Sequence, residues 1–188
     1  MRKIIVSMHI TLDGFVAGPN GEMDWISFDD ELFDFVERFT AKADTALYGR
    51  VTYQMMDSYW PTAAEKPHAS KHDIAHSRWY KSVVKLVVSA TMSGQDSPDT
   101  QFIGADIAKQ IEQIKQQAGK DILIFGSPSV VHYLTHKHLI DEYWLFVNPV
   151  LMGQGIPMFK DITERVKLNF LEAKTFACGV TGLHYEKR

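Results

Sequence analysis

Short apolar runs separated by amphipathic stretches define most of the chain. We interpret the runs as strands over residues 3–12, 45–48, 85–89, 121–125 and 142–147, with a shorter edge strand over 99–103. Continuous apolar runs of this length are typical of strands that are covered on both faces. The pattern therefore predicts a largely parallel sheet between two layers of helices.

Segments with helical spacing alternate with these strands. Ser27 opens the first, and Asp30, three residues later, can be the acidic member of a capping box. A second helix begins at residue 50, and we expect Pro61 to end it. The pattern also predicts an amphipathic helix capped by Asp106 and stopped by Gly119. Strands joined through helices in this way are typical of parallel strand pairs.

Two strand–glycine–helix junctions stand out. In the stretch 121–134, Gly126 ends a buried strand, Ser127 is a good N-cap, and Pro128 suits the first helical position. In the second junction, Gly49 is followed by Arg50. Free N–H groups and the helix dipole favour an anion at such a point. The alternatives are an ordinary turn and a solvated arginine.

The last part of the chain has a different pattern. Apolar and polar residues alternate over 167–176 and 180–186, which predicts a terminal antiparallel hairpin. No repeat or domain-sized linker interrupts the sequence. We therefore expect one α/β domain over residues 1–188, with a mainly parallel central sheet and an antiparallel C-terminal edge hairpin.

Composition narrows the class of protein. The net charge of −3 gives no overall bias toward nucleic acid or acidic membranes, and no run reaches membrane-spanning length. The single cysteine, Cys178, excludes an internal disulfide framework. His68, His72 and His76 have helical spacing but lack a zinc pattern, so we expect a solvated helix face and no metal. These features predict a soluble, cytoplasmic protein.

Three predicted strand ends converge on one candidate site. They lie at residues 48–49, 89–90 and 125–126, and the carboxyl ends of parallel strands share one edge of a sheet, where ligands of open α/β sheets bind. Neither a G-x-G-x-x-G fingerprint nor a Walker loop is present. We favour a dinucleotide bound across the strand ends. The loop 18–21 is either a lid over this site or a plain surface turn.

Five segments in order resemble a known family. They are SMHITLDGFVA at 7–17, LYGRVT at 47–52, VVSA at 87–90, IFG at 124–126 and NPVLMGQGIPMF at 148–159. Together they resemble the dihydrofolate reductase-like superfamily, in particular stand-alone bacterial relatives of the riboflavin-biosynthesis (RibD) C-terminal reductase domain. The resemblance implies the three-layer dihydrofolate reductase-like fold, NADPH as hydride donor with NADH as an alternative, and a homodimer.

The resemblance also implies roles for individual residues. Those expected at the cofactor are Leu12, Gly14 and Ala17 beside the nicotinamide, Gly49, Arg50 and Thr52 at the pyrophosphate and the ribose phosphate, Ser89 near the adenosine, and Gly126 and Ser127 on the other side of the pyrophosphate.

Two departures from the family pattern concern phosphate binding. Ser127 stands where relatives have a second glycine; a serine can still donate to phosphate but restricts the backbone. Ala90 and Thr91 stand where many relatives carry a second cation. A preference for NADPH over NADH therefore depends mainly on Arg50.

The candidate catalytic residue is Asp30. Aligning Trp25 with the tryptophan that precedes the first helix in dihydrofolate reductases places Asp30 at the carboxylate that serves the pteridine ring. The alternative, which we favour slightly, is that Asp30 only caps the helix. Asp24 replaces the usual proline before that tryptophan, which weakens folate as the substrate.

The sequence thus predicts an NAD(P)H-dependent reductase of a small pteridine- or pyrimidine-like heterocycle. One alternative is a nucleotide-binding module that has lost catalysis. Another is an interaction protein on the same fold that dimerises through the apolar strand 142–147.

Overall fold

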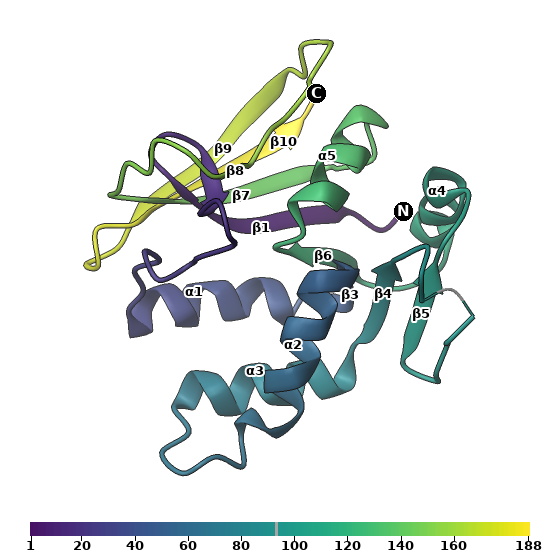
Figure 1. Cartoon of the computed structure of the whole chain (residues 1–188), viewed down its shortest axis with the longest axis horizontal. Helices are drawn as coiled ribbons and strands as arrows, with labels where there is room; N and C mark the ends of the chain where they lie inside the picture. Colours follow the sequence, from purple (N-terminus) through teal and green to yellow (C-terminus); the bar gives the residue numbers. More distant parts are fainter. Residues whose placement is uncertain (93) are drawn as a thin grey trace.

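An eight-stranded sheet runs through the computed structural model, which describes residues 1–92 and 94–188 (Figure 1). The strand order is β5-β4-β3-β6-β1-β7-β10-β9. The strands of this sheet are β1 (Ile4–Thr11), β3 (Ala43–Gly49), β4 (Val84–Val88), β5 (Thr100–Ile103), β6 (Asp121–Phe125), β7 (Glu142–Asn148), β9 (Leu168–Thr175) and β10 (Thr181–Lys187). A separate two-stranded sheet pairs β2 (Phe15–Ala17) with β8 (Ile156–Pro157).

The pairing confirms the predicted fold class. The strands from β5 to β7 are parallel to their neighbours, whereas β10 is antiparallel to both β7 and β9. The terminal hairpin and the edge position of β5 are therefore as expected. Because β7 is paired on both sides and five of its seven residues are consecutively buried, this strand offers no dimerisation face of the kind suggested by its sequence.

Helices cover both faces of the sheet (Figure 1). One layer contains α1 (Asp30–Thr40), α2 (Arg50–Ala63) and α3 (Lys71–Ser82), and the other contains α4 (Ile107–Gln116) and α5 (Pro128–His136). Side-chain alternation along β1 explains the layers. Ile4 and Val6 pack with α4 and α5, whereas Ile5 packs with Leu32 and Phe35 of α1.

The start of α1 differs from the sequence prediction. Its N-cap is Asp29, whose Oδ1 accepts the Leu32 N–H at 2.8 Å, so Ser27 and Asp30 form no capping box. The Ser27 N–H instead donates to Oδ1 of buried Asn148 at 2.8 Å. A tertiary hydrogen bond to β7 thus holds the chain extended until Asp29.

Other helix boundaries also required correction. Pro61 lies inside α2, which continues to Ala63, because proline's φ suits a helix and costs one hydrogen bond near the end. Asp106 occupies the N-cap position of α4 in a left-handed conformation, without a side-chain capping bond. That helix ends at Gln116, and its C-cap is Gln117 rather than Gly119.

The prediction of a solvated helix face was wrong for His72 and His76 of α3, and His68 lies before that helix. His76 is buried, with its ring centroid 4.1 Å from that of Trp60, and His72 stacks on Phe33 at 3.8 Å. Packing of α3 against α1 and α2 removes these rings from solvent. His68 is exposed. No candidate metal cluster occurs among residues 1–92 and 94–188, and no helix there is long and apolar enough to cross a membrane.

Candidate active site

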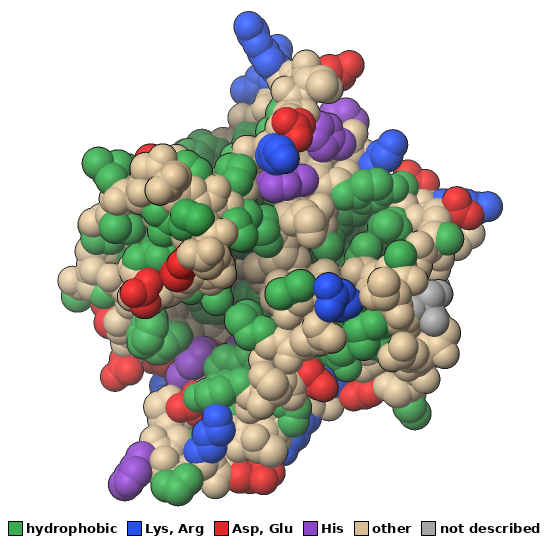
Figure 2. Space-filling view, in the orientation of Figure 1, with side chains coloured by type: hydrophobic (Ala, Val, Ile, Leu, Met, Phe, Trp, Pro, Cys, Tyr) green, Lys and Arg blue, Asp and Glu red, His purple; other side chains and the backbone are tan. Residues whose placement is uncertain are grey.

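The carboxyl ends of β3, β4 and β6 open into a cavity of about 980 Å³. The first turns of α2 and α5 and residues of β2 and β8 also line it. This face of the molecule is hollowed near its centre, with hydrophobic side chains around the hollow (Figure 2). The volume is at the upper end of the usual range for ligand pockets.

Seven of the nine predicted cofactor residues line this cavity. They are Ala17, Gly49, Arg50, Thr52, Ser89, Gly126 and Ser127. The other two, Leu12 and Gly14, are in the turn between β1 and β2 but outside the lining. The Leu12 side chain is 66% exposed, and Gly14 contributes its carbonyl to the Met158 N–H at 2.8 Å. The structure therefore places Leu12 and Gly14 outside the cavity lining.

A hydrogen bond joins the two strand–glycine–helix junctions. The Gly49 N–H donates to the Ser127 hydroxyl at 2.7 Å, in a buried position. Ser127 adopts φ 62° and forms no side-chain capping bond, because its hydroxyl is directed across to β3. A hydroxyl that accepts one hydrogen bond keeps its own proton to donate. Ser127 thus carries a donor that the described protein groups leave for a ligand.

Gly126 occupies a position that needs glycine. Its φ of +67° lies in the left-handed region, and a Cβ there would be 3.2 Å from Cγ2 of Thr52. This close approach brings the start of α2 against the turn before α5. Both helix N-termini consequently face the same part of the cavity.

The charged side chains described in the cavity wall are cations. Arg50 and Lys160 line it, and no aspartate or glutamate is among the lining residues that the structure describes. The positive ends of two helix dipoles add to these cations. Arg50 is exposed, and its guanidinium donates to Gln54 Oε1 at 3.2 Å, which leaves most of its donors available. This part of the cavity is suited to a polyanion such as a pyrophosphate.

The remaining wall is apolar and rich in methionine. Met8, Met23 and Met55 contribute from β1, the loop before α1, and α2. Methionine packs well against flat rings of varied shape. The cavity wall therefore combines cationic groups with apolar side chains.

Most of the other lining residues were not predicted from the sequence. Among them are His132 and Tyr133 on α5, and Lys160, which follows β8. The Nε2 atom of His132 is 3.0 Å from the Pro157 carbonyl oxygen, which ties α5 to β8. The glycine-rich segment 148–159 was recognised, but nothing in its pattern showed that it folds over the cavity.

The carboxylate of Asp13 links two loops beside the cavity. Asp13 accepts the N–H groups of Met152 and Gly153, the latter at 2.7 Å, and the Thr11 hydroxyl at 2.6 Å. These hydrogen bonds, led by that of Thr11, lower the pKa of Asp13 to about 2. The turn after β1 and the loop before β8 are therefore linked at neutral pH.

Asp30 is not in the cavity wall. It is exposed at the first position of α1. The neighbouring Asp29 accepts hydrogen bonds from the N–H groups of Leu32 and Cys178, which lower its pKa. Asp29 therefore anchors α1 to the β9–β10 turn. The sequence argument assigned the structural role to the wrong member of this acidic pair.

Comparisons with known proteins agree with this geometry. The family model described as RibD C-terminal domain matches residues 2–181. The chain is 34% identical over 186 residues to "Uncharacterized protein YyaP" of Bacillus subtilis (strain 168), which covers 98% of this chain and 94% of the relative.

Solved structures share the fold. A protein of Shewanella sp. PV-4 with a proposed role in riboflavin biosynthesis matches with a TM-score of 0.75 and 20% identity over 99% of both chains. The dihydrofolate reductase of Enterococcus faecalis, complexed with NADP(H), matches with a TM-score of 0.64 and 13% identity over 99% of this chain and 96% of that one. The fold is thus dihydrofolate reductase-like, and the chain belongs to the RibD C-terminal domain family.

Proposed function

We propose that the protein is an NADPH-dependent reductase that transfers hydride to a small pteridine- or pyrimidine-like heterocycle. The observation that carries this proposal is the wall of the cavity: two helix starts and the cations Arg50 and Lys160 line it together with many apolar side chains, and none of its described lining residues is a carboxylate. That combination suits a molecule that contains both phosphates and a nicotinamide ring. A reductase-type function also agrees with the family.

The chain's own groups bind and orient the cofactor in this proposal. The pyrophosphate lies between the starts of α2 and α5. The Ser127 hydroxyl donates a hydrogen bond to it there, and Thr52 also lines this part of the cavity. Arg50 pairs with the phosphate on the adenosine ribose, and Ser89 borders the adenosine. Bound NADPH supplies the hydride.

The substrate packs beside the methionine side chains of the cavity wall. Met8, Met23 and Met55 exclude water there and hold a flat ring against the nicotinamide. Asp30 is outside the cavity wall, so its proposed role as proton source requires that the substrate extend toward α1. A homodimer is part of the proposal and would leave this cavity on each protomer.

Nicotinamide fluorescence during titration with NADPH tests cofactor binding, and absorbance loss with a panel of pteridines and aminopyrimidines tests turnover. We expect saturable binding and reduction of at least one ring. Absence of NADPH binding would overturn the proposal. Binding without turnover of any ring would favour a nucleotide-binding module that has lost catalysis.

A further inference from the structure

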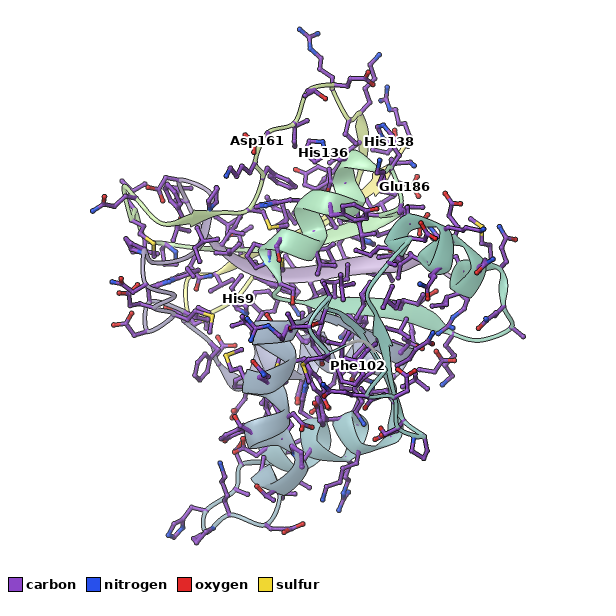
Figure 3. The ribbon with its side chains drawn as sticks, turned by 45° about the vertical axis from the view of Figure 1, so that its right-hand side comes forward. His9, Phe102, His136, His138, Asp161 and Glu186 are labelled. Atoms are coloured by element: carbon purple, nitrogen blue, oxygen red, sulfur yellow. The ribbon has the colours of Figure 1, made fainter. Side chains whose placement is uncertain are left out.

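Lys160 is a cation of the cavity wall that neither helix start supplies. It follows β8 and lines the cavity together with Arg50, the first residue of α2. Asp161, the next residue, lies in a loop that passes alongside α5 (Figure 3). A third segment of the chain, besides the starts of α2 and α5, therefore brings positive charge to the cavity, and the phosphate contacts proposed above do not use it.

The backbone that leads to Lys160 is fixed by two neighbouring elements. The Pro157 carbonyl oxygen is 3.0 Å from Nε2 of His132 on α5. The Met158 N–H donates to the Gly14 carbonyl oxygen at 2.8 Å, and the Met158 side chain is fully buried. Since Lys160 comes two residues after Met158, its side chain is attached beside α5 and the turn that leads into β2.

The order of the strands shows which part of the cavity this is. Along the sheet, β4 with Ser89 after it is followed by β3 with Arg50 after it, then by β6, and then by β1. Strand β8 pairs with β2, which comes directly after β1 in the chain. Neighbouring strands are about 4.8 Å apart, so β1 is roughly 14 Å from β4. Lys160 thus belongs to the part of the cavity that is remote from Ser89.

This order assigns the two cations to different phosphates of a dinucleotide. In the proposed binding mode, Ser89 borders the adenosine, and Arg50 pairs with the phosphate on its ribose. The pyrophosphate lies further along, between the starts of α2 and α5, and α5 is the helix that His132 ties to the segment before Lys160. A lysine is a compact charge on a flexible stem, so it can pair with a diphosphate without the fixed geometry of a guanidinium.

The Lys160 ammonium is available to an anion. Its ion pair within residues 1–92 and 94–188 is with Asp161, at 3.8 Å from Nζ to Oδ2, between side chains that are 60% and 75% exposed. Exposed pairs of this kind are weak and are screened by salt. The lining residues that the structure describes include no carboxylate that would compete with a phosphate. A phosphate that enters the cavity can therefore replace Asp161 as the partner of Lys160.

We propose that Lys160 is a positioning residue for the cofactor, whose ammonium pairs with the pyrophosphate of a bound nicotinamide dinucleotide. This inference rests on the proposed function, because it requires that the cavity bind this cofactor. The Ser127 hydroxyl and the free N–H groups of the helix starts are neutral donors to the same group, and Lys160 adds a full charge to them. Since NADPH and NADH share the pyrophosphate, Lys160 raises the affinity for both, whereas Arg50 distinguishes them.

The test titrates the full chain with NADPH and with NADH. It also records the phosphorus NMR spectrum of bound NADPH, in which the pyrophosphate and the ribose phosphate give separate signals. Lys160→Met removes the charge and keeps a long side chain, and Lys160→Arg restores a cation. Lys167→Met is the matched control, because Lys167 is exposed in the connection between β8 and β9 and lies outside the cavity lining. Urea denaturation checks that each variant folds.

We expect Lys160→Met to weaken NADPH and NADH by the same factor, about three- to thirtyfold, as for an exposed hydrogen bond to a charged group. The pyrophosphate signals of bound NADPH should shift, and the ribose phosphate signal should stay in place. Lys160→Arg should recover most of the affinity, and Lys167→Met should match wild type. Arg50→Ala should show the opposite pattern, with a shifted ribose phosphate signal.

Unchanged affinity and unchanged pyrophosphate signals in Lys160→Met would overturn the inference and leave the proposed function in place. A loss confined to NADPH, with a shifted ribose phosphate signal, would overturn it as well. If Lys160→Met does not fold, Lys160→Gln takes its place, and if NADH binds too weakly to titrate, the phosphorus signals decide alone. Failure of the wild-type protein to bind NADPH would be seen separately and would overturn the proposed function itself.

Discussion

The two strand–glycine–helix junctions have the same sequence pattern but different physical designs. Gly49 has φ −85°, which any residue adopts, and is small because a Cβ would be 3.3 Å from Val130. Gly126 has φ +67° and needs glycine for its backbone. At the first junction the next side chain, Arg50, is exposed, whereas at the second Ser127 is buried.

The two junctions therefore contribute different features to the cavity wall. The first junction supplies charge on a side chain that is free to move toward a ligand. The second supplies a rigid backbone and a hydroxyl that is fixed by the Gly49 N–H. We therefore expect changes at the first junction to act mainly on affinity and changes at the second to act also on stability.

The largest effect is expected from Arg50→Ala. Losing a hydrogen bond to a charged group costs about 1.5–3 kcal/mol, or about ten- to a hundredfold in affinity for NADPH. NADH, which lacks the ribose phosphate, should be affected much less. Fluorescence titration with both cofactors measures this, with Arg78→Ala as an exposed helix control. Equal weakening of both would show that Arg50 does not contact the ribose phosphate.

Ser127→Ala should lower both stability and affinity. It leaves the Gly49 N–H buried without its partner, which costs about 1–3 kcal/mol in the free energy of unfolding. Urea denaturation of the free protein and NADPH titration separate the two effects. Ser129→Ala removes an exposed hydroxyl from the same helix turn and should leave stability unchanged. An unchanged unfolding midpoint in Ser127→Ala would contradict the assignment.

Gly126→Ala tests the backbone of the second junction. A side chain in the left-handed region costs about 1–2 kcal/mol, and the contact with Thr52 adds to this. Gly153→Ala is the matched control, because Gly153 has φ +79° with open space around its Cβ position. Urea denaturation should therefore show a larger loss for Gly126→Ala. Equal losses would mean that the Thr52 contact is unimportant.

Gly49→Ala should change stability by less than about 1 kcal/mol. The backbone accepts alanine, and the reduced entropy of the unfolded chain offsets the crowding at Val130. A loss as large as that of Gly126→Ala, measured by the same denaturation, would show that the two glycines are required for the same reason after all.

Asp30→Asn should have the smallest effect on NADPH affinity and on stability. The residue is exposed and outside the cavity wall, so NADPH affinity and the unfolding midpoint should stay within error of wild type. Asp29→Asn, at the residue that caps α1, is the contrasting variant and should lower the midpoint. A loss of turnover in Asp30→Asn with intact cofactor binding would establish a catalytic role.

Sequence patterns predicted the structural features that are determined by residues close together in the chain. The apolar runs predicted the strands, and the glycines followed by helix starts predicted positions that line the cavity. The capping of α1 could not be predicted, because a distant side chain, Asn148, holds Ser27. The burial of His76 likewise depends on how three helices pack. Lys160 enters the site through a loop whose path is set by tertiary contacts.

The Gly49–Ser127 hydrogen bond spans 78 positions of the chain. This part of the cavity wall therefore has no local precursor: during synthesis it cannot form until β6 and the start of α5 have left the ribosome and β6 has paired with β3. A ligand that binds there stabilises the folded domain by mass action, and no fragment ending before residue 127 should bind it.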